Sequence, residues 1–107
     1  MITVIDAPLL TEKTVKKVDK IRNRINNEKF NSSICAITLS SNDSDVFDIV
    51  PLFNFNFKSK CNEEVIIVGF AENKKAALKM CARLATEYLK LDNKISMREY
   101  FKNILLQ

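Results

Sequence analysis

The spacing of apolar residues divides the chain into helical and extended stretches. Between residues 11 and 29, apolar side chains recur every three or four positions, which is the repeat of one side of a helix. The residues of this apolar stripe are Val15, Val18, Ile21 and Ile25. The same spacing predicts a helix over 73–91, whose buried side consists of Ala77, Cys81, Leu84, Tyr88 and Leu91. Ser96 is expected to cap a last helix that extends to about residue 106.

Three stretches between these helices have the pattern of strands. Residues 33–40 form a short apolar run, and residues 45–58 alternate between apolar and polar side chains. Pro51 interrupts the alternation, which favours a bulge or an edge position there. Residues 64–70 include the run Val65, Ile66, Ile67 and Val68, which is apolar at both parities. Both faces of this third strand are therefore expected to be covered.

The order of elements predicts an α+β fold. Turn-forming residues at 41–44 and 59–62 give short links, so the three strands are expected to form an antiparallel sheet with two helices packed on one face. We expect a single domain over 1–107, with a core at 11–92 and an extra C-terminal helix at 95–106.

Composition argues against catalysis and against bound metal. The 107 residues include no histidine, one glycine and three cysteines that form no C-x-x-C pair. A four-ligand zinc site, a histidine-activated nucleophile and a glycine-rich phosphate loop are all missing their usual residues. We expect no enzyme activity, no cofactor and no small-molecule substrate. The odd, widely spaced cysteines favour reduced thiols in an intracellular compartment, and no apolar run is long enough for a membrane span.

Charge is unevenly distributed along the chain, although the net charge is only +4. Residues 11–30 carry seven basic and three acidic side chains, and residues 73–102 carry eight basic and three acidic ones. The segment 31–72 has two basic and six acidic side chains. The predicted helices are thus basic, which indicates a polyanion as their partner.

Residues 69–85 carry the most specific motif. An apolar strand is followed by a glycine, a capping residue, a lysine pair and a helix of small residues, and this order resembles the end of the double-stranded RNA-binding domain. The matching residues are Gly69, Ala71 for a second glycine, Asn73 for a serine, Lys74, Lys75, Ala77, Cys81, Ala82 and Ala85. Leu78 replaces the family's third lysine, and the loop at 40–45 is acidic where the family has a groove-binding sequence. The motif covers less than a fifth of the chain.

The resemblance implies binding of double-stranded RNA without sequence specificity, as a module of an RNA-processing protein. In this family the start of the last long helix contacts phosphates, which here designates Lys74 and Lys75. The nucleic-acid-binding candidates also include the helix cap, the basic residues that follow Lys75 at four-residue spacing, and basic residues of the first helix. The full set is Asn73, Lys74, Lys75, Lys79, Arg83, Lys17, Lys20 and Arg24.

A second hypothesis follows from the third strand. Some members of the family act as protein-interaction or dimerisation modules, and the apolar run Val65–Val68 is the possible interaction surface for a protein partner or a homodimer. The alternative for this run is that the C-terminal helix of the same chain covers it. Neither hypothesis involves a membrane.

Overall fold

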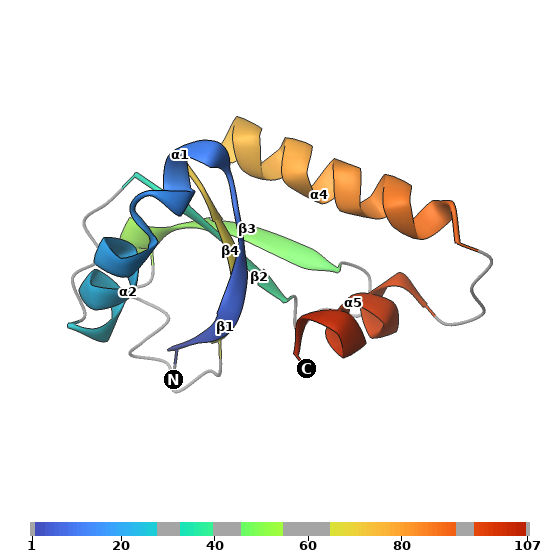
Figure 1. The fold of residues 1–107 in the computed structure, drawn as a ribbon, viewed down its shortest axis with the longest axis horizontal. Helices are drawn as coiled ribbons and strands as arrows, with labels where there is room; N and C mark the ends of the chain where they lie inside the picture. Colours follow the sequence, from blue (N-terminus) through green and yellow to red (C-terminus); the bar gives the residue numbers. More distant parts are fainter. Residues whose placement is uncertain (1, 28–32, 40–45, 55–64, 92–95, 107) are drawn as a thin grey trace.

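The computed structural model describes residues 2–27, 33–39, 46–54, 65–91 and 96–106 (Figure 1). In chain order the elements are β1 (Ile2–Leu10), α1 (Glu12–Val15), α2 (Val18–Asn26), β2 (Cys35–Leu39), β3 (Phe47–Pro51), the 3-10 turn η1 (Leu52–Asn54), β4 (Val65–Ala71), α4 (Lys74–Leu89) and α5 (Met97–Leu105). The predicted turns at 41–44 and 59–62 and the acidic loop at 40–45 lie outside the described residues.

The described strands form one mixed sheet in the order β1-β4-β2-β3. β4 runs parallel to β1 and antiparallel to β2, and β2 pairs antiparallel with β3 on its other side. The α+β class is confirmed, as is the antiparallel pairing of the first two predicted strands. The prediction of a three-stranded sheet is wrong: a fourth strand precedes the first helix, and β4 pairs with β2 and β1 rather than with β3.

The strand missing from the sequence prediction is β1. Asp6 and Pro8 break its apolar pattern, and a proline is tolerated in this strand because β1 lies at the edge of the sheet. Its pairing with β4 shifts register between Val4 and Leu9. Arg22 of α2 donates hydrogen bonds to the carbonyl oxygens of Ile5 and Asp6, at 2.7 and 2.9 Å, in the irregular stretch. Arg22 thereby supplies hydrogen-bond donors to carbonyl groups in the part of β1 that does not pair with β4.

The first helix is divided into α1 and α2. The single helix predicted over 11–29 is interrupted at Lys16 and Lys17, which separate α1 from α2. In α2, Ile21 and Ile25 are buried as the stripe predicts, whereas Val15 of α1 is 51% exposed. One stripe does not describe both pieces, because the helix is interrupted between Val15 and Val18.

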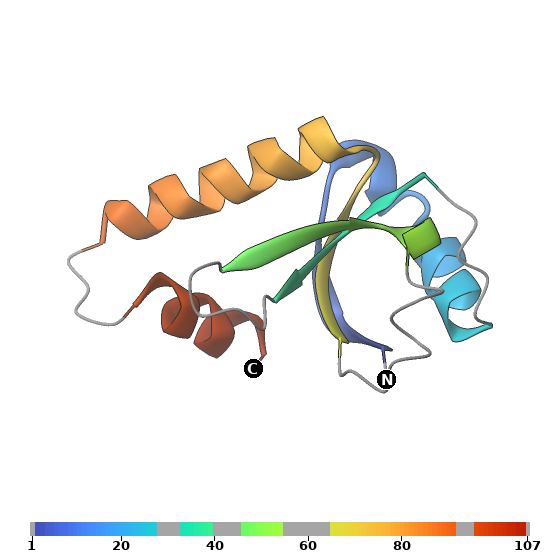
Figure 2. The ribbon, with the colours of Figure 1, turned by 180° about the vertical axis from the view of Figure 1, so that it is seen from behind.

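Helices cover both faces of the sheet, as Figures 1 and 2 show. On one face, Ile21 and Ile25 of α2 pack with Ala36 and Phe70. On the other face, α4 packs against Cys35, Ile37 and Val68 through Ala77 and Met80. The prediction of two helices on one face is therefore wrong. Alternate residues of β2 face opposite cores, so Ala36 belongs to one cluster and its neighbours to the other.

The run Val65–Val68 lies in the interior of the sheet. β4 has β1 on one side and β2 on the other, and Val65, Ile67 and Val68 are buried. The prediction that both faces of this strand are covered is confirmed, and this chain's own helices cover them. Both edges of β4 are paired and only Ile66 of the run is half-buried, and the hypothesis of a partner chain at Val65–Val68 stays an untested prediction.

The strand predicted over 45–58 is much shorter in the structure. Pro51 ends β3, because proline cannot donate to the ladder, and a 3-10 turn follows over Leu52–Asn54. The part of the predicted strand beyond residue 54 lies outside the described residues.

Both C-terminal helices begin as the sequence indicates. Asn73 caps α4, and the Ser96 hydroxyl accepts a 3.2 Å hydrogen bond from the Glu99 amide at the start of α5. On α4, Ala77 is buried and Cys81, Leu84 and Tyr88 are half-buried, but Leu91 is exposed, because the helix ends at Leu89. Met80, which the predicted buried side omits, is buried. No helix in the described part of the chain is long and apolar enough to cross a membrane.

Candidate nucleic-acid interface

The start of α4 combines a capped helix end with two exposed lysines. The side-chain oxygen of Asn73 accepts a hydrogen bond of 2.8 Å from the Ala76 amide, which fixes the first turn. Lys74 and Lys75 are exposed in that turn, and the turn contains no acidic residue. Their charges add to the partial positive charge of the helix end, so this end attracts anions.

A hydrogen-bond network holds α1 against the start of α4. The Thr11 hydroxyl donates to a carboxylate oxygen of Glu72 at 2.6 Å, and the Thr11 amide donates to Thr14 Oγ1 at 2.8 Å. The buried Thr14 hydroxyl lies 3.2 Å from the carbonyl oxygen of Phe70 in β4. α1 is thus attached to the two residues on either side of Ala71, directly before α4 begins.

Glu72 is the acidic residue of this network, and its environment favours the charged form. The hydrogen bond from Thr11 is the main reason that the pKa of Glu72 lies below its ordinary value, and the charge of Lys13 acts in the same direction. A carboxylate that accepts a hydrogen bond is harder to protonate. Because its charge is directed to Thr11 and Lys13, Glu72 leaves Lys74 and Lys75 unpaired in the described part of the chain.

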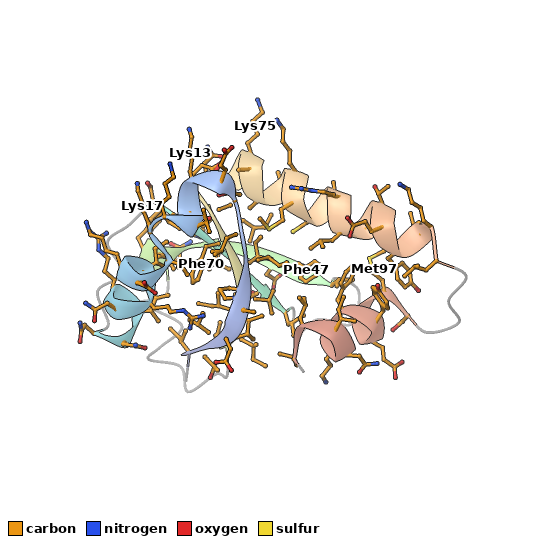
Figure 3. All side chains as sticks on the ribbon, viewed as in Figure 1. Lys13, Lys17, Phe47, Phe70, Lys75 and Met97 are labelled. Atoms are coloured by element: carbon orange, nitrogen blue, oxygen red, sulfur yellow. The ribbon has the colours of Figure 1, made fainter. Side chains whose placement is uncertain are left out.

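The lysines of α1 and of α4 gather on one side of the molecule. In Figure 3, Lys13, Lys17 and Lys75 point outward from neighbouring elements, away from the hydrophobic core. We call Lys13, Lys17, Lys74 and Lys75 the α1–α4 basic surface. It joins segments about sixty residues apart in the sequence, as the contact between Thr11 and Glu72 does.

Lys79 and Arg83 extend this surface along α4 with different surroundings. Lys79 is exposed one turn beyond Lys75. Arg83 borders a hollow that it shares with Glu87 and with Leu9 and Leu10 of β1. The carboxylate of Glu87 reduces the positive potential near Arg83, so α4 is most basic at its N-terminal end. Leu78, at the position where the resemblance expects a lysine, is 52% exposed, so packing does not require an apolar side chain there.

The nucleic-acid-binding candidates of the first predicted helix form a second basic group, beside α2. Lys17, Lys20 and Arg24 line one cavity beside α2, and Lys17 belongs to both groups because it lies at the junction of α1 and α2. The structure therefore brings the eight candidates together as two adjoining basic regions rather than as one line along two helices.

Sequence reasoning missed Lys13, Thr11 and Glu72 as parts of the interface. Lys13 falls on the same basic stripe as Lys17, which was a signal for it. The pairing of Thr11 with Glu72 had no local signal, because it depends on how β1 and β4 align.

The described thiols do not form a reactive site. Burial raises the pKa of Cys35, an effect that the charge of Lys74 partly offsets, and burial also raises the pKa of Cys81. Both cysteines are free. A raised pKa keeps a thiol protonated and poorly nucleophilic at neutral pH. Among the described residues, no three possible metal ligands lie close enough together to hold an ion.

Fold and site together define a small α+β domain with a mixed four-stranded sheet and a basic surface at one helix end. Comparison with known proteins finds no matching family model and no significant match among curated proteins or solved structures.

Proposed function

We propose that this domain binds double-stranded RNA through contacts between the α1–α4 basic surface and the phosphate backbone, without reading base sequence. The observation that carries the proposal is the exposed pair Lys74 and Lys75 at the positive end of α4. The ammonium groups would contact phosphate oxygens and release counterions from the duplex. The place of the domain within an RNA-processing protein is part of the same proposal and rests on the resemblance of residues 69–85.

Local electrostatics support a polyanionic partner. Two lysines in the first turn of a helix are unfavourable in the free protein, because the helix dipole already makes that end positive. Lys13 of α1 and Lys17, at the junction of α1 and α2, add to this charge on the same side of the molecule (Figure 3). A bound phosphate backbone would remove the repulsion, which makes such a surface more suitable for an extended anion than for a neutral partner.

The motif at residues 69–85 is the reason for proposing double-stranded RNA as the polyanion. The order of strands in the sheet does not add to this argument. The minor-groove contacts of the double-stranded RNA-binding domain belong to an element order that this chain does not have. Of the contacts that this family makes with RNA, we therefore propose only the phosphate contacts for this chain, at Lys74 and Lys75. Dimerisation through Val65–Val68 is not proposed, because these residues lie inside the sheet.

The direct test compares polyanions by fluorescence anisotropy at several salt concentrations. The ligands are an RNA duplex of about 20 base pairs, the matching DNA duplex and the two single RNA strands. The proposal expects the RNA duplex to bind most tightly and its affinity to fall steeply with salt. Equal affinity for RNA and DNA duplexes would contradict the choice of RNA. Absence of binding to every ligand at low salt would contradict the proposal as a whole.

A further inference from the structure

A cavity of about 240 Å³ lies beside α2, at the end of the α1–α4 basic surface. One side of α2 forms its wall, with Lys17, Lys20, Ile21 and Arg24 at the spacing of adjacent helical turns. Ile34, just before β2, and Leu52, just after β3, complete the lining together with Ser33. Residues from three separate segments thus form one hollow.

The floor of this cavity is apolar and well packed. Ile21 is 2% exposed and Leu52 is 1% exposed, so their side chains present only small surfaces to the cavity. The Leu52 amide donates a 2.9 Å hydrogen bond to the Ile34 carbonyl oxygen, which holds these two parts of the lining together. A floor of this kind suits a flat apolar group rather than a hydrated ion.

The rim of the cavity is cationic. Lys17 and Lys20 are exposed and Arg24 is half-buried, and none of the three makes an ion pair within the described part of the chain. No carboxylate is among the described lining residues. Arg22 of the same helix provides the contrast, because its guanidinium is used to bond the carbonyl oxygens of Ile5 and Asp6. The three rim cations have no comparable structural role.

We propose that this cavity binds a single nucleotide, with the phosphate on Lys17, Lys20 and Arg24 and the base on the floor formed by Ile21, Ile34 and Leu52. The cations match a phosphate, and an arginine among them can bond two of its oxygens at once. The apolar floor matches the face of a base, and the small volume limits the ligand to one nucleotide. The Ser33 hydroxyl is placed to bond a polar atom of the base or the ribose.

This nucleotide has two possible sources, a free mononucleotide or the phosphorylated end of an RNA chain. The chemistry of the site is the same for both. The inference does not depend on the start of α4, because the cavity shares Lys17 with the α1–α4 basic surface but neither Lys74 nor Lys75. Loss of binding at either region can therefore be observed separately.

The test follows isoleucine and leucine methyl signals by NMR during titration with adenosine monophosphate. We expect saturable shifts of the Ile21 and Leu52 methyl groups, and binding roughly tenfold or more weaker for inorganic phosphate or adenosine alone. The Lys20→Ala/Arg24→Ala variant should lose at least about tenfold in affinity. The matched control, Lys90→Ala/Lys102→Ala, removes two exposed cations from α4 and α5 and should bind as the parent does.

The Lys74→Ala/Lys75→Ala variant should keep its affinity for the mononucleotide, which separates this site from the proposed duplex surface. Single-stranded RNA with a 5′-phosphate will bind more tightly than the mononucleotide if an RNA end is the source, and no more tightly if the source is free nucleotide. The inference would be overturned if the mononucleotide gave no saturable shift at Ile21 and Leu52. Equal affinity for inorganic phosphate, or an undiminished affinity of Lys20→Ala/Arg24→Ala, would overturn it as well.

Discussion

Gly69 shows how one residue can satisfy a motif and also meet a demand of the fold. A β-carbon placed on Gly69 would lie 2.8 Å from the carbonyl oxygen of Leu9 and 3.0 Å from the Leu9 β-carbon. β1 therefore approaches β4 at a distance that only glycine permits. In the motif this glycine precedes the last helix, whereas in the structure its absent side chain makes room for a strand that the motif does not include.

We predict that Gly69→Ala destabilises the protein by about 1–3 kcal/mol, the usual cost of extra atoms in a packed interior. The added methyl group would press on the β1 backbone, which cannot move away without breaking its pairing with β4. Urea denaturation followed by circular dichroism measures the loss. Asn103→Ala, on the exposed side of α5, is the control and should stay within about 0.5 kcal/mol of the parent. A Gly69→Ala protein as stable as the control would contradict this packing.

Capping residues illustrate which contacts could be predicted. Asn73 bonds the amide of Ala76, three residues along, and Ser96 bonds that of Glu99. Such contacts depend only on local spacing, so the sequence indicates them. The bond between Thr11 and Glu72 spans sixty-one residues and depends on the whole sheet, so no local pattern could indicate it.

A pH dependence follows from the Thr11–Glu72 bond. Because the pKa of Glu72 is lowered in the folded state, this carboxylate contributes stability at pH values above its unfolded pKa of about 4.3. That contribution is lost as the pH falls through the lower, folded pKa. In Thr11→Val the main cause of the shift is absent, so the pKa of Glu72 should rise towards its ordinary value.

An NMR titration of the Glu72 side chain in the parent and in Thr11→Val measures this change directly. Thr86→Val, at an exposed position in another part of α4, is the control and should leave the Glu72 pKa as it is in the parent. The same Glu72 pKa in Thr11→Val as in the parent would show that Thr11 is not responsible for the shift.

At the scale of elements, hydrophobic periodicity located α2, α4 and α5 but not the faces that they cover. Each helix has one apolar side, and a sheet that is apolar on both faces can accept it on either. α5 packs through Phe101, which is 1% exposed and lies 5.3 Å from Phe47 and 5.0 Å from Tyr100 between ring centres. These aromatic contacts connect the last helix to β3 and to Tyr88 of α4.

Phe101→Ala is predicted to cost about 3–5 kcal/mol, because it removes a buried aromatic ring and leaves a cavity. Hydrogen exchange should show α5 opening before the rest of the protein, since Phe101 is the buried residue among the described side chains of this helix. Ile104→Ala, at a position that is 46% exposed on the same helix, is the control and should have a much smaller effect. Similar exchange rates in α5 of the two variants would contradict this assignment.

At the scale of the whole molecule, the α+β class and the β2–β3 pairing follow from local pattern, whereas the sheet order does not. Strands that are close in sequence pair readily, as β2 and β3 do. β1 and β4 pair across more than fifty residues, and β1 carries Asp6 and Pro8, which conceal it. The same pairing brings α1 beside α4 and creates the basic surface. The sequence identified Lys17, Lys74 and Lys75 of this surface but not Lys13, and the fold determines which of these lysines lie together.

The most direct test of the proposed function compares the salt dependence of duplex RNA binding in the parent, in Lys74→Ala/Lys75→Ala and in the control Lys90→Ala/Lys102→Ala. Each lost phosphate contact should reduce the slope of log affinity against log salt by about one, so the double variant should lose about two and bind weakly at every salt concentration. Its thermal unfolding should match that of the parent, because both lysines are exposed. The control should keep the parent's slope. If Lys74→Ala/Lys75→Ala binds duplex RNA with the affinity and slope of the parent, the start of α4 is not the phosphate-binding surface.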